Sequence, residues 1–185
     1  MKKQNSTMKM VTLGMFCAIS IILVYLVHFP IFPAAAFLEY DPADIPIFII
    51  TFLFGPLSGV ITTVVVSVLQ WLLVSQASGW IGCLMHIAAT GSFVLVAGFI
   101  YKYHKTLKGA IVALVCGIIT MTAIMAIWNL VFTPIFMGAP RQAVLQLMLP
   151  CILPFNLIKA SVNSLLSFLL YKSVGRAIRK ILNEN

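Results

Sequence analysis

Long apolar runs separated by short polar segments divide this chain of 185 residues. A helix needs about 20 mainly apolar residues to cross a hydrocarbon core of about 30 Å. Apolar runs that approach or exceed this length occupy residues 7–28, 80–101, 110–132 and 154–171. The pattern therefore predicts four membrane-spanning helices at these positions.

The apolar stretch over residues 45–74 is too long for one comfortable span, and Gly55-Pro56 interrupts it. A glycine next to a proline is a turn signal. The stretch is therefore either one long span or two short spans that turn at "FGPLSG".

The basic residues decide between these two alternatives, because cytoplasmic loops of membrane proteins carry an excess of Lys and Arg. If residues 45–74 crossed once, the segment "KYHKTLKG" would lie outside, whereas two crossings place every basic cluster inside. We therefore predict spans at 45–54 and 59–74, six helices in total, and both termini in the cytoplasm. The clusters are Lys2, Lys3 and Lys9; Lys102, Lys105 and Lys108; and Lys172, Arg176, Arg179 and Lys180.

Composition supports the same class of protein. Hydrophobic residues make up 62% of the chain, charged residues make up 9%, and the mean hydropathy is +1.09, far from the values of soluble domains. The net charge of +8 arises near the ends of apolar runs and not on a face that could follow a nucleic acid. We expect an all-α integral membrane protein, one domain over residues 1–185, which contacts the lipid bilayer and binds no nucleic acid.

The chain lacks the motifs of common enzymatic chemistry. The sequence contains no GxxxxGK[ST] phosphate loop, no HExxH and no GxSxG. Its four cysteines lie singly inside apolar runs and are expected to be packing residues. The one acidic cluster, Glu39, Asp41 and Asp44, is the only candidate metal site and leaves an intramembrane metal-dependent enzyme as an alternative. We predict no catalytic residue, no metal and no cofactor.

A polar stripe marks the last predicted span. Asn156, Lys159 and Asn163 are spaced i, i+3 and i+7, which places them on one face of a helix. A lysine inside a membrane costs about 2.5 to 3.5 kcal/mol on insertion scales, so Lys159 either snorkels to the interface or serves a cavity. The stripe suits a ligand rich in hydroxyl or carbonyl groups. Asn129, near the outer end of the preceding span, is expected to face the same cavity.

Two further polar residues lie inside predicted spans. For Gln70 the alternatives are a ligand contact and a packing role. For His86 the alternatives are a neutral ring bonded to a helix neighbour and a ligand contact. Aromatic and apolar side chains in the external segments are either interface anchors or surfaces on which a flat ligand stacks; they are Phe37, Leu38, Tyr40 and Trp80.

The acidic segment "FLEYDPADIP" is predicted to lie outside, between the first two spans. Asp44 precedes Ile45-Pro46, which predicts a helix N-cap. Asp41-Pro42 is a turn signal. We therefore expect the two carboxylates to shape an external loop.

A pair of small residues, Gly14 and Ala18, lies four positions apart in the first predicted span. Small residues at this spacing allow another helix to approach closely. The sequence leaves open whether that helix belongs to this chain or to a partner.

The sequence resembles the substrate-binding (S) components of energy-coupling factor (ECF) transporters, and within them the riboflavin-specific RibU family. The run "FPIFPAAAFLEYDPADIPIFIITFLFGPLSGV" is similar to the family's first external loop, its D-x-P segment and its "FGPLAG"-like turn. "WNLVF" and "PFNLIKA" look like the family's ligand-contacting positions in the last two helices. The segment "SGWIGCLMHIAATGS" stands in place of a "GDPVGPFANF"-like segment.

The resemblance implies a six-helix S-component bundle in a bacterial cell membrane that binds riboflavin from outside. It also implies a transmembrane T component and two cytoplasmic ATPases as partners, with Gly14 and Ala18 standing where the family docks on the T component. The positions implied for the ligand are Leu38, Tyr40, Trp80, Gly82, Asn129, Asn156, Lys159 and Asn163. The alternatives are an S component for another vitamin or small heterocycle, and a self-contained secondary transporter.

Overall fold

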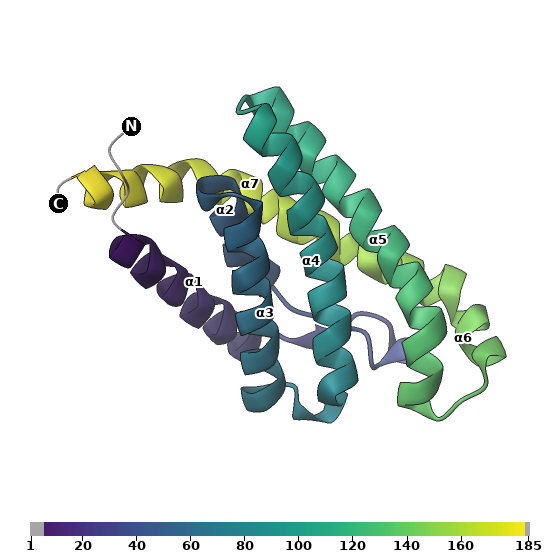
Figure 1. The fold of residues 1–185 in the computed structure, drawn as a ribbon. Helices are drawn as coiled ribbons and strands as arrows, with labels where there is room; N and C mark the ends of the chain where they lie inside the picture. Colours follow the sequence, from purple (N-terminus) through teal and green to yellow (C-terminus); the bar gives the residue numbers. More distant parts are fainter. Residues whose placement is uncertain (1–5, 184–185) are drawn as a thin grey trace.

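The computed structural model describes residues 6–183, which form an elongated bundle of helices (Figure 1). The basic residues Lys2 and Lys3 lie outside the described residues, as do the side chains of Arg179 and Lys180. The α-helices are α1 (Ser6–Leu26), α2 (Asp44–Phe54), α3 (Pro56–Leu73), α4 (Gly79–Tyr103), α5 (Leu107–Met137), α6 (Arg141–Leu147) and α7 (Leu153–Asn183).

Five helical segments of the described residues are long and apolar enough to cross a membrane: Thr7–Leu26, Pro56–Leu73, Gln76–Tyr103, Leu107–Met137 and Arg141–Ile178. Helix α2 has only 11 residues and rises about 16 Å at 1.5 Å per residue, about half of a hydrocarbon core. Nine of its residues are buried. Helix α2 is therefore a central element that its neighbours enclose, and few of its side chains can reach lipid.

A sharp turn at Gly55 separates α2 from α3, as the sequence predicts. Gly55 has a φ of 92°, a conformation that only glycine adopts without strain. Pro56 then occupies the first turn of α3, where its missing N–H costs no helical hydrogen bond. Helix α4 approaches this turn closely at Gly98, where an added Cβ would lie 2.9 Å from the Cα of Pro56.

The segment between α1 and α2 is ordered and folds against the bundle. Strands β1 (Phe29–Pro30) and β2 (Glu39–Tyr40) pair antiparallel, with Phe29 opposite Tyr40. A 3-10 turn over Pro33–Ala35 lies between the strands. We refer to residues 27–43 as the first loop.

The chain after the predicted span 110–132 is more helical than the sequence indicated. Helix α5 continues through Pro134 to Met137 and ends at Gly138, whose φ is 60°. Helix α6 begins only three residues later. A π-helical turn over Met148–Ile152 joins α6 to α7, so the chain is helical from Arg141 to Asn183.

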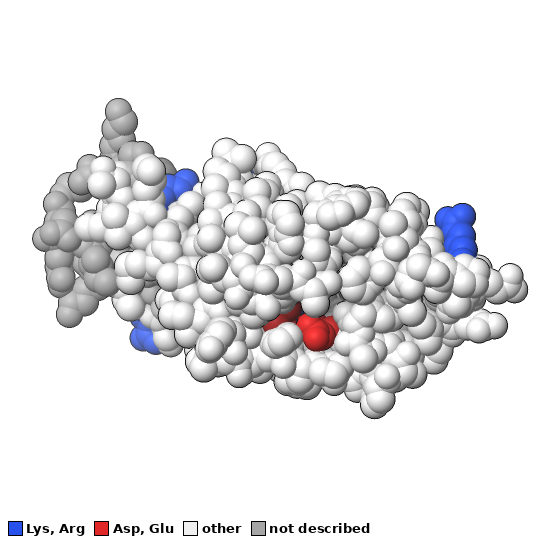
Figure 2. Space-filling model, turned by 90° about the horizontal axis from the view of Figure 1, so that it is seen from below, with Lys and Arg blue, Asp and Glu red and all other residues white. Residues whose placement is uncertain are grey.

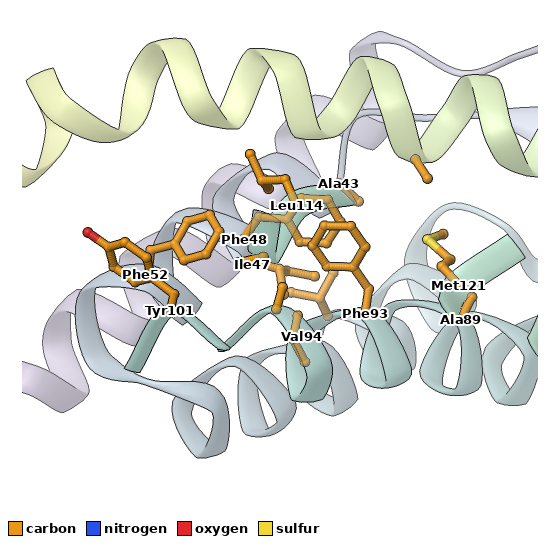
Figure 3. Packing of buried hydrophobic residues seen from close by; sticks show 14 of the residues in the cluster. Ala43, Ile47, Phe48, Phe52, Ala89, Phe93, Val94, Tyr101, Leu114 and Met121 are labelled. Atoms are coloured by element: carbon orange, nitrogen blue, oxygen red, sulfur yellow. The ribbon is translucent and has the colours of Figure 1, made fainter. Parts of the chain in front are cut away.

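The apolar core lies between α2, α4 and α5, with α7 against it (Figure 3). Phe48 of α2 stacks on Phe93 of α4, with ring centroids 3.8 Å apart and an interplanar angle of 10°. Gly117 of α5 leaves room for the Phe93 ring, because a Cβ there would lie 2.8 Å from a ring carbon. This packing fixes α2, and with it the polar residues at its N-terminus.

Candidate ligand-binding site

A cavity of about 160 Å³ lies between the first loop and helices α3, α4, α5 and α7. Figure 2 shows a face on which the acidic side chains gather near the middle, whereas Lys and Arg appear only toward its ends. The cavity walls are mainly apolar with a few polar groups, the usual form of a small-molecule site. Residues that border the cavity include Leu38, Asp41, Gln70, Gly82, His86, Met121, Met125, Asn129, Phe155, Asn156 and Lys159.

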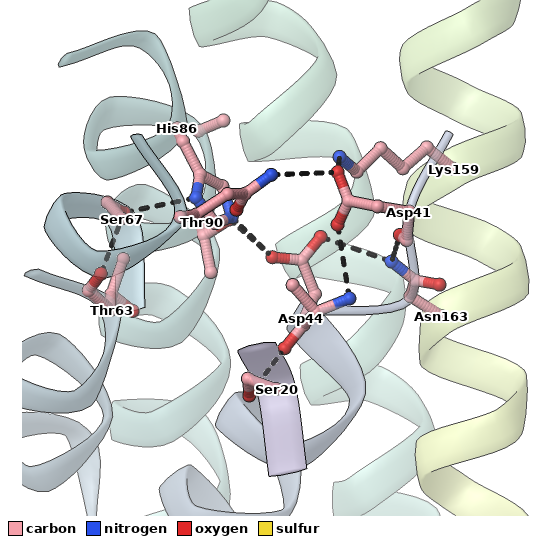
Figure 4. A network of polar contacts seen from close by, with 12 residues as sticks. Ser20, Asp41, Asp44, Thr63, Ser67, His86, Thr90, Lys159 and Asn163 are labelled. Atoms are coloured by element: carbon pink, nitrogen blue, oxygen red, sulfur yellow. Dashed lines mark hydrogen bonds and ion pairs between the residues drawn. The ribbon is translucent and has the colours of Figure 1, made fainter. Parts of the chain in front are cut away.

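An ion pair joins the first loop to α7 at the edge of this cavity. Nζ of Lys159 donates to Oδ2 of Asp41 at 2.7 Å, and both side chains are buried (Figure 4). The two alternatives expected for Lys159, snorkelling to the interface and serving a cavity, did not include the acid that neutralises its charge. Asp41 also accepts from the backbone N–H of Ala43 at 3.1 Å, which confirms the turn predicted at Asp41-Pro42.

Asn163 connects the first loop to α7 at a second point. Its Nδ2 donates to the carbonyl oxygen of Asp41 and to Oδ2 of Asp44, both at 3.1 Å. Its Oδ1 accepts from the hydroxyl of Tyr40 at 2.9 Å. Burial raises the pKa of the Tyr40 phenol, so this hydroxyl stays protonated and can donate near neutral pH.

Asp44 connects α2 to α4, and its predicted role as an N-cap is wrong. Ala43 is the N-cap of α2 and makes no side-chain cap bond. The Asp44 carboxylate instead accepts from Thr90 at 2.7 Å and lies 3.1 Å from Nε2 of His86. Because the helices pack closely, Thr90 and His86 bind the Asp44 carboxylate in place of the backbone N–H groups at the start of α2.

His86 lies between two neighbouring helices. Its Nδ1 is 3.0 Å from the hydroxyl of Ser67 on α3, and its Nε2 faces Asp44 on α2. The ring is thus satisfied within the bundle, although it also borders the cavity. Together Asp41, Asp44 and their partners link the first loop to α2, α3, α4 and α7.

The two asparagines expected at the ligand both border the cavity. Nδ2 of Asn129 donates to the carbonyl oxygen of Met125, and Oδ1 accepts from Thr133, each at 2.8 Å. Nδ2 of Asn156 donates to the carbonyl oxygen of Ile152 at 2.8 Å. Each Nδ2 carries a second hydrogen that a ligand can use.

The structure brings five of the eight predicted ligand positions to the cavity, namely Leu38, Gly82, Asn129, Asn156 and Lys159. Tyr40 and Asn163 are buried in the polar network next to the cavity. Trp80 does not border the cavity, and 54% of its surface is exposed. Contact of these eight residues with a ligand stays a prediction.

Gly14 and Ala18 are both exposed on α1. Apart from the adjoining residues and backbone of α1 itself, no described atom lies within 4 Å of the place where a Cβ on Gly14 would be. Within residues 6–183, no other helix therefore packs against Gly14 at that point, and a role of the pair in partner contact stays a prediction.

The acidic cluster is divided among separate partners. Oε2 of Glu39 lies 3.0 Å from Nε2 of His28, whereas Asp41 and Asp44 pair with Lys159 and His86. Within residues 6–183, no three His, Cys, Asp or Glu side chains are grouped to hold a metal ion.

Sequence reasoning missed that Asp41 is the partner of Lys159. One signal could have found it, because the chain has only four acidic residues and a lysine within a span needs a compensating charge. The roles of Ser67 and Thr90 had no comparable signal, since hydroxyls on apolar helices commonly bond their own backbone.

Comparison with known proteins gives consistent matches over most of the chain. The family model for the substrate-specific component of ECF transporters matches residues 8–171. The riboflavin transporter RibU of Staphylococcus aureus (strain TCH60) is 30% identical over 179 residues, covering 94% of this chain and 93% of the relative. The riboflavin transporter FmnP of Bacillus subtilis (strain 168) is 29% identical over 171 residues, covering 88% of this chain and 90% of the relative.

Two solved structures share the fold. The S component of a bacterial ECF transporter superposes with a TM-score of 0.79 at 31% identity, covering 92% of this chain and 96% of that structure. The S component for biotin from an ECF-type ABC transporter gives a TM-score of 0.62 at 21% identity, covering 93% of this chain and 95% of that structure.

Proposed function

The chain belongs to the substrate-specific components of ECF transporters, and on this basis we propose that it captures riboflavin at the outer face of a bacterial cell membrane. Proteins of this family are integral membrane subunits of transporters and not enzymes. The observation that carries the choice of riboflavin is the similarity to two riboflavin transporters over nearly the whole chain. The biotin S component shares only the fold.

The chemistry of the cavity supports this choice. Riboflavin combines a flat tricyclic ring with a chain of hydroxyl groups, and it needs apolar walls as well as hydrogen-bond donors. Leu38, Met121, Met125 and Phe155 supply apolar surface, and methionine sulfur packs favourably on aromatic rings. Lys159, Asn129 and Asn156 supply N–H donors for ring carbonyls or ribityl oxygens.

The cavity is small for a ligand site, which suggests that the first loop moves when the ligand binds. A volume of about 160 Å³ is below the range of about 300–1,000 Å³ that is typical of ligand sites. Leu38 of the first loop forms part of the wall. We infer that this loop moves outward to admit riboflavin and then closes over the ring.

The proposed complex contains a transmembrane T component and two cytoplasmic ATPases. This chain has no phosphate loop of its own, so partners must supply the energy of ATP hydrolysis. Gly14 and Ala18 are the proposed contact with the T component. In this arrangement both termini face the cytoplasm.

The test is the visible spectrum of the purified full-length chain, followed by titration with riboflavin while ligand fluorescence is recorded. Bound flavin absorbs visible light and loses fluorescence, so a yellow protein or saturable quenching is expected. A colourless protein that quenches no riboflavin fluorescence would sink the proposal, and saturable binding of biotin would favour a different vitamin. Uptake by liposomes that contain this chain alone would favour a secondary transporter.

A further inference from the structure

We propose that Gln70 of α3 accepts a hydrogen bond from the bound ligand and so selects ligands that carry a donor at that point. The inference rests on the proposed riboflavin site and names a recognition contact within it.

Gln70 has a buried acceptor that the described part of the chain leaves unused. The side chain borders the cavity, and its Oε1 is buried without a hydrogen-bond partner among the described residues. The other such atoms are the hydroxyls of Thr122 and Ser164, which do not border the cavity. Buried polar atoms are rarely left without a partner, because desolvation is then uncompensated.

Asp41 determines which end of the Gln70 amide lacks a hydrogen-bond partner. Nε2 of Gln70 lies 3.5 Å from Oδ2 of Asp41. A carboxylate can only accept hydrogen bonds, so exchanging the amide nitrogen and oxygen would place two acceptors against each other. The end without a partner is therefore the carbonyl oxygen, and its missing partner must be a donor.

The contact with Asp41 is weak enough to allow this amide to adjust. A separation of 3.5 Å is beyond the usual range of 2.7–3.2 Å for N–H donors. Lys159 already satisfies the same Oδ2 atom at 2.7 Å. A small shift of Gln70 toward a ligand would therefore leave the ion pair of Asp41 intact, while the carboxylate still disfavours exchange of the amide nitrogen and oxygen.

The polar groups near Gln70 differ in what they can offer a ligand. Lys159 can only donate, and the amide oxygen of Asn129 already accepts from Thr133. Riboflavin presents two kinds of donor, the imide N–H of its ring and the hydroxyls of its ribityl chain. Ring carbonyls would suit the donors of Lys159 and the asparagines, whereas Gln70 would take the imide N–H or one ribityl hydroxyl.

The test compares wild type with Gln70→Met, which has a similar length and no amide. Fluorescence-quenching titrations would use riboflavin, riboflavin methylated on the imide nitrogen, and lumiflavin, whose ribityl chain is replaced by a methyl group. Gln70→Met is expected to weaken riboflavin binding about tenfold, which corresponds to 1.4 kcal/mol. Gln76→Met is the matched control, because Gln76 is exposed and its Nε2 bonds the carbonyl oxygen of Leu72.

The two analogues identify the donor. If Gln70 accepts from the imide N–H, the variant loses affinity for lumiflavin but not for the methylated flavin. If it accepts from a ribityl hydroxyl, the variant loses affinity for the methylated flavin but not for lumiflavin. Gln70→Leu, which also lacks the acceptor, should repeat the pattern.

Two results would overturn the inference. One is wild-type affinity of Gln70→Met for all three flavins, and the other is an equal loss for all three, which would indicate a structural role. A wild-type chain that binds none of these flavins would overturn both the proposed function and this contact. Tight riboflavin binding by wild type and Gln70→Met alike would overturn only the contact.

Discussion

Nζ of Lys159 lies 2.7 Å from Oδ2 of Asp41, although the two residues are 118 positions apart in the sequence. The pair holds the first loop on α7 beside the cavity and neutralises a buried ammonium group. Removal of one member of a buried ion pair leaves the other charge without compensation, which typically costs about 3–5 kcal/mol. Lys159 therefore combines a structural role with its proposed contact to riboflavin.

Lys159→Met is expected to weaken riboflavin binding at least about tenfold, because the variant loses the proposed donor at the ligand. The protein should still insert into the membrane. Fluorescence-quenching titration of the purified variant measures the affinity, and unchanged affinity would show that Lys159 does not contact riboflavin.

The stability of the ion pair is a separate prediction. Asp41→Asn and Lys159→Met should each lower the apparent Tm without ligand, and the double variant should lose less than the sum of the two losses. Contacting pairs typically show coupling energies of about 0.5–3 kcal/mol. Thermal unfolding of all four proteins in one detergent measures this coupling, and additive losses would contradict a direct interaction.

The sequence predicts much of the fold because membrane crossing needs long apolar runs, and those runs are visible without tertiary information. The turn at Gly55-Pro56 was also predictable, since both residues have strong local preferences. The enclosure of α2 was not, because burial depends on which helices surround it. Likewise the spacing of Asn156, Lys159 and Asn163 predicts one face, whereas the distant partner Asp41 depends on how the first loop folds back.

Gly98→Ala should destabilise the contact between α4 and the turn before α3. The new Cβ would lie 2.8 Å from Cγ2 of Thr51 and 2.9 Å from the Cα of Pro56, and overpacking of this kind typically costs about 1–3 kcal/mol. Gly91→Ala is the control on the same helix, because no described atom outside the adjoining part of α4 lies within 4 Å of its added Cβ. Thermal unfolding should show a lower Tm for Gly98→Ala alone; equal values would contradict the close approach.

Tyr40→Phe should remove the donor that satisfies Oδ1 of Asn163. Leaving a buried acceptor without its donor costs about 1–3 kcal/mol. Tyr25→Phe is the control, because 76% of Tyr25 is exposed. Thermal unfolding at neutral pH measures the difference, and equal stability of Tyr40→Phe and wild type would contradict the role of this bond.

The advantage of Tyr40 over Phe should also depend on pH. Because burial raises the pKa of Tyr40 in the folded state, above about pH 10 the unfolded chain loses the phenolic proton while the folded chain keeps it. Stability then falls as pH rises. The difference in Tm between wild type and Tyr40→Phe should shrink above about pH 10, and a constant difference would contradict the shift.

Ala18→Trp should prevent assembly with the T component while riboflavin binding is retained, because a large side chain would block close helix approach at Gly14 and Ala18. Ile19→Trp is the control, since Ile19 is 41% exposed and points about 100° away around the helix. Co-purification with the T component measures assembly. Normal assembly of Ala18→Trp would show that the T component docks on a different surface.

The π-helical turn over Met148–Ile152 determines the direction in which the side chains of α7 point around the helix axis. A π-turn contains one residue more than an α-helical turn, and each residue of an α-helix advances about 100° around the axis. A deletion of one residue there would rotate Lys159 and Asn163 by roughly that angle relative to α6. Because of the extra residue, the side chains of α6 and the face of α7 that meets Asp41 point in different directions around one continuous helix.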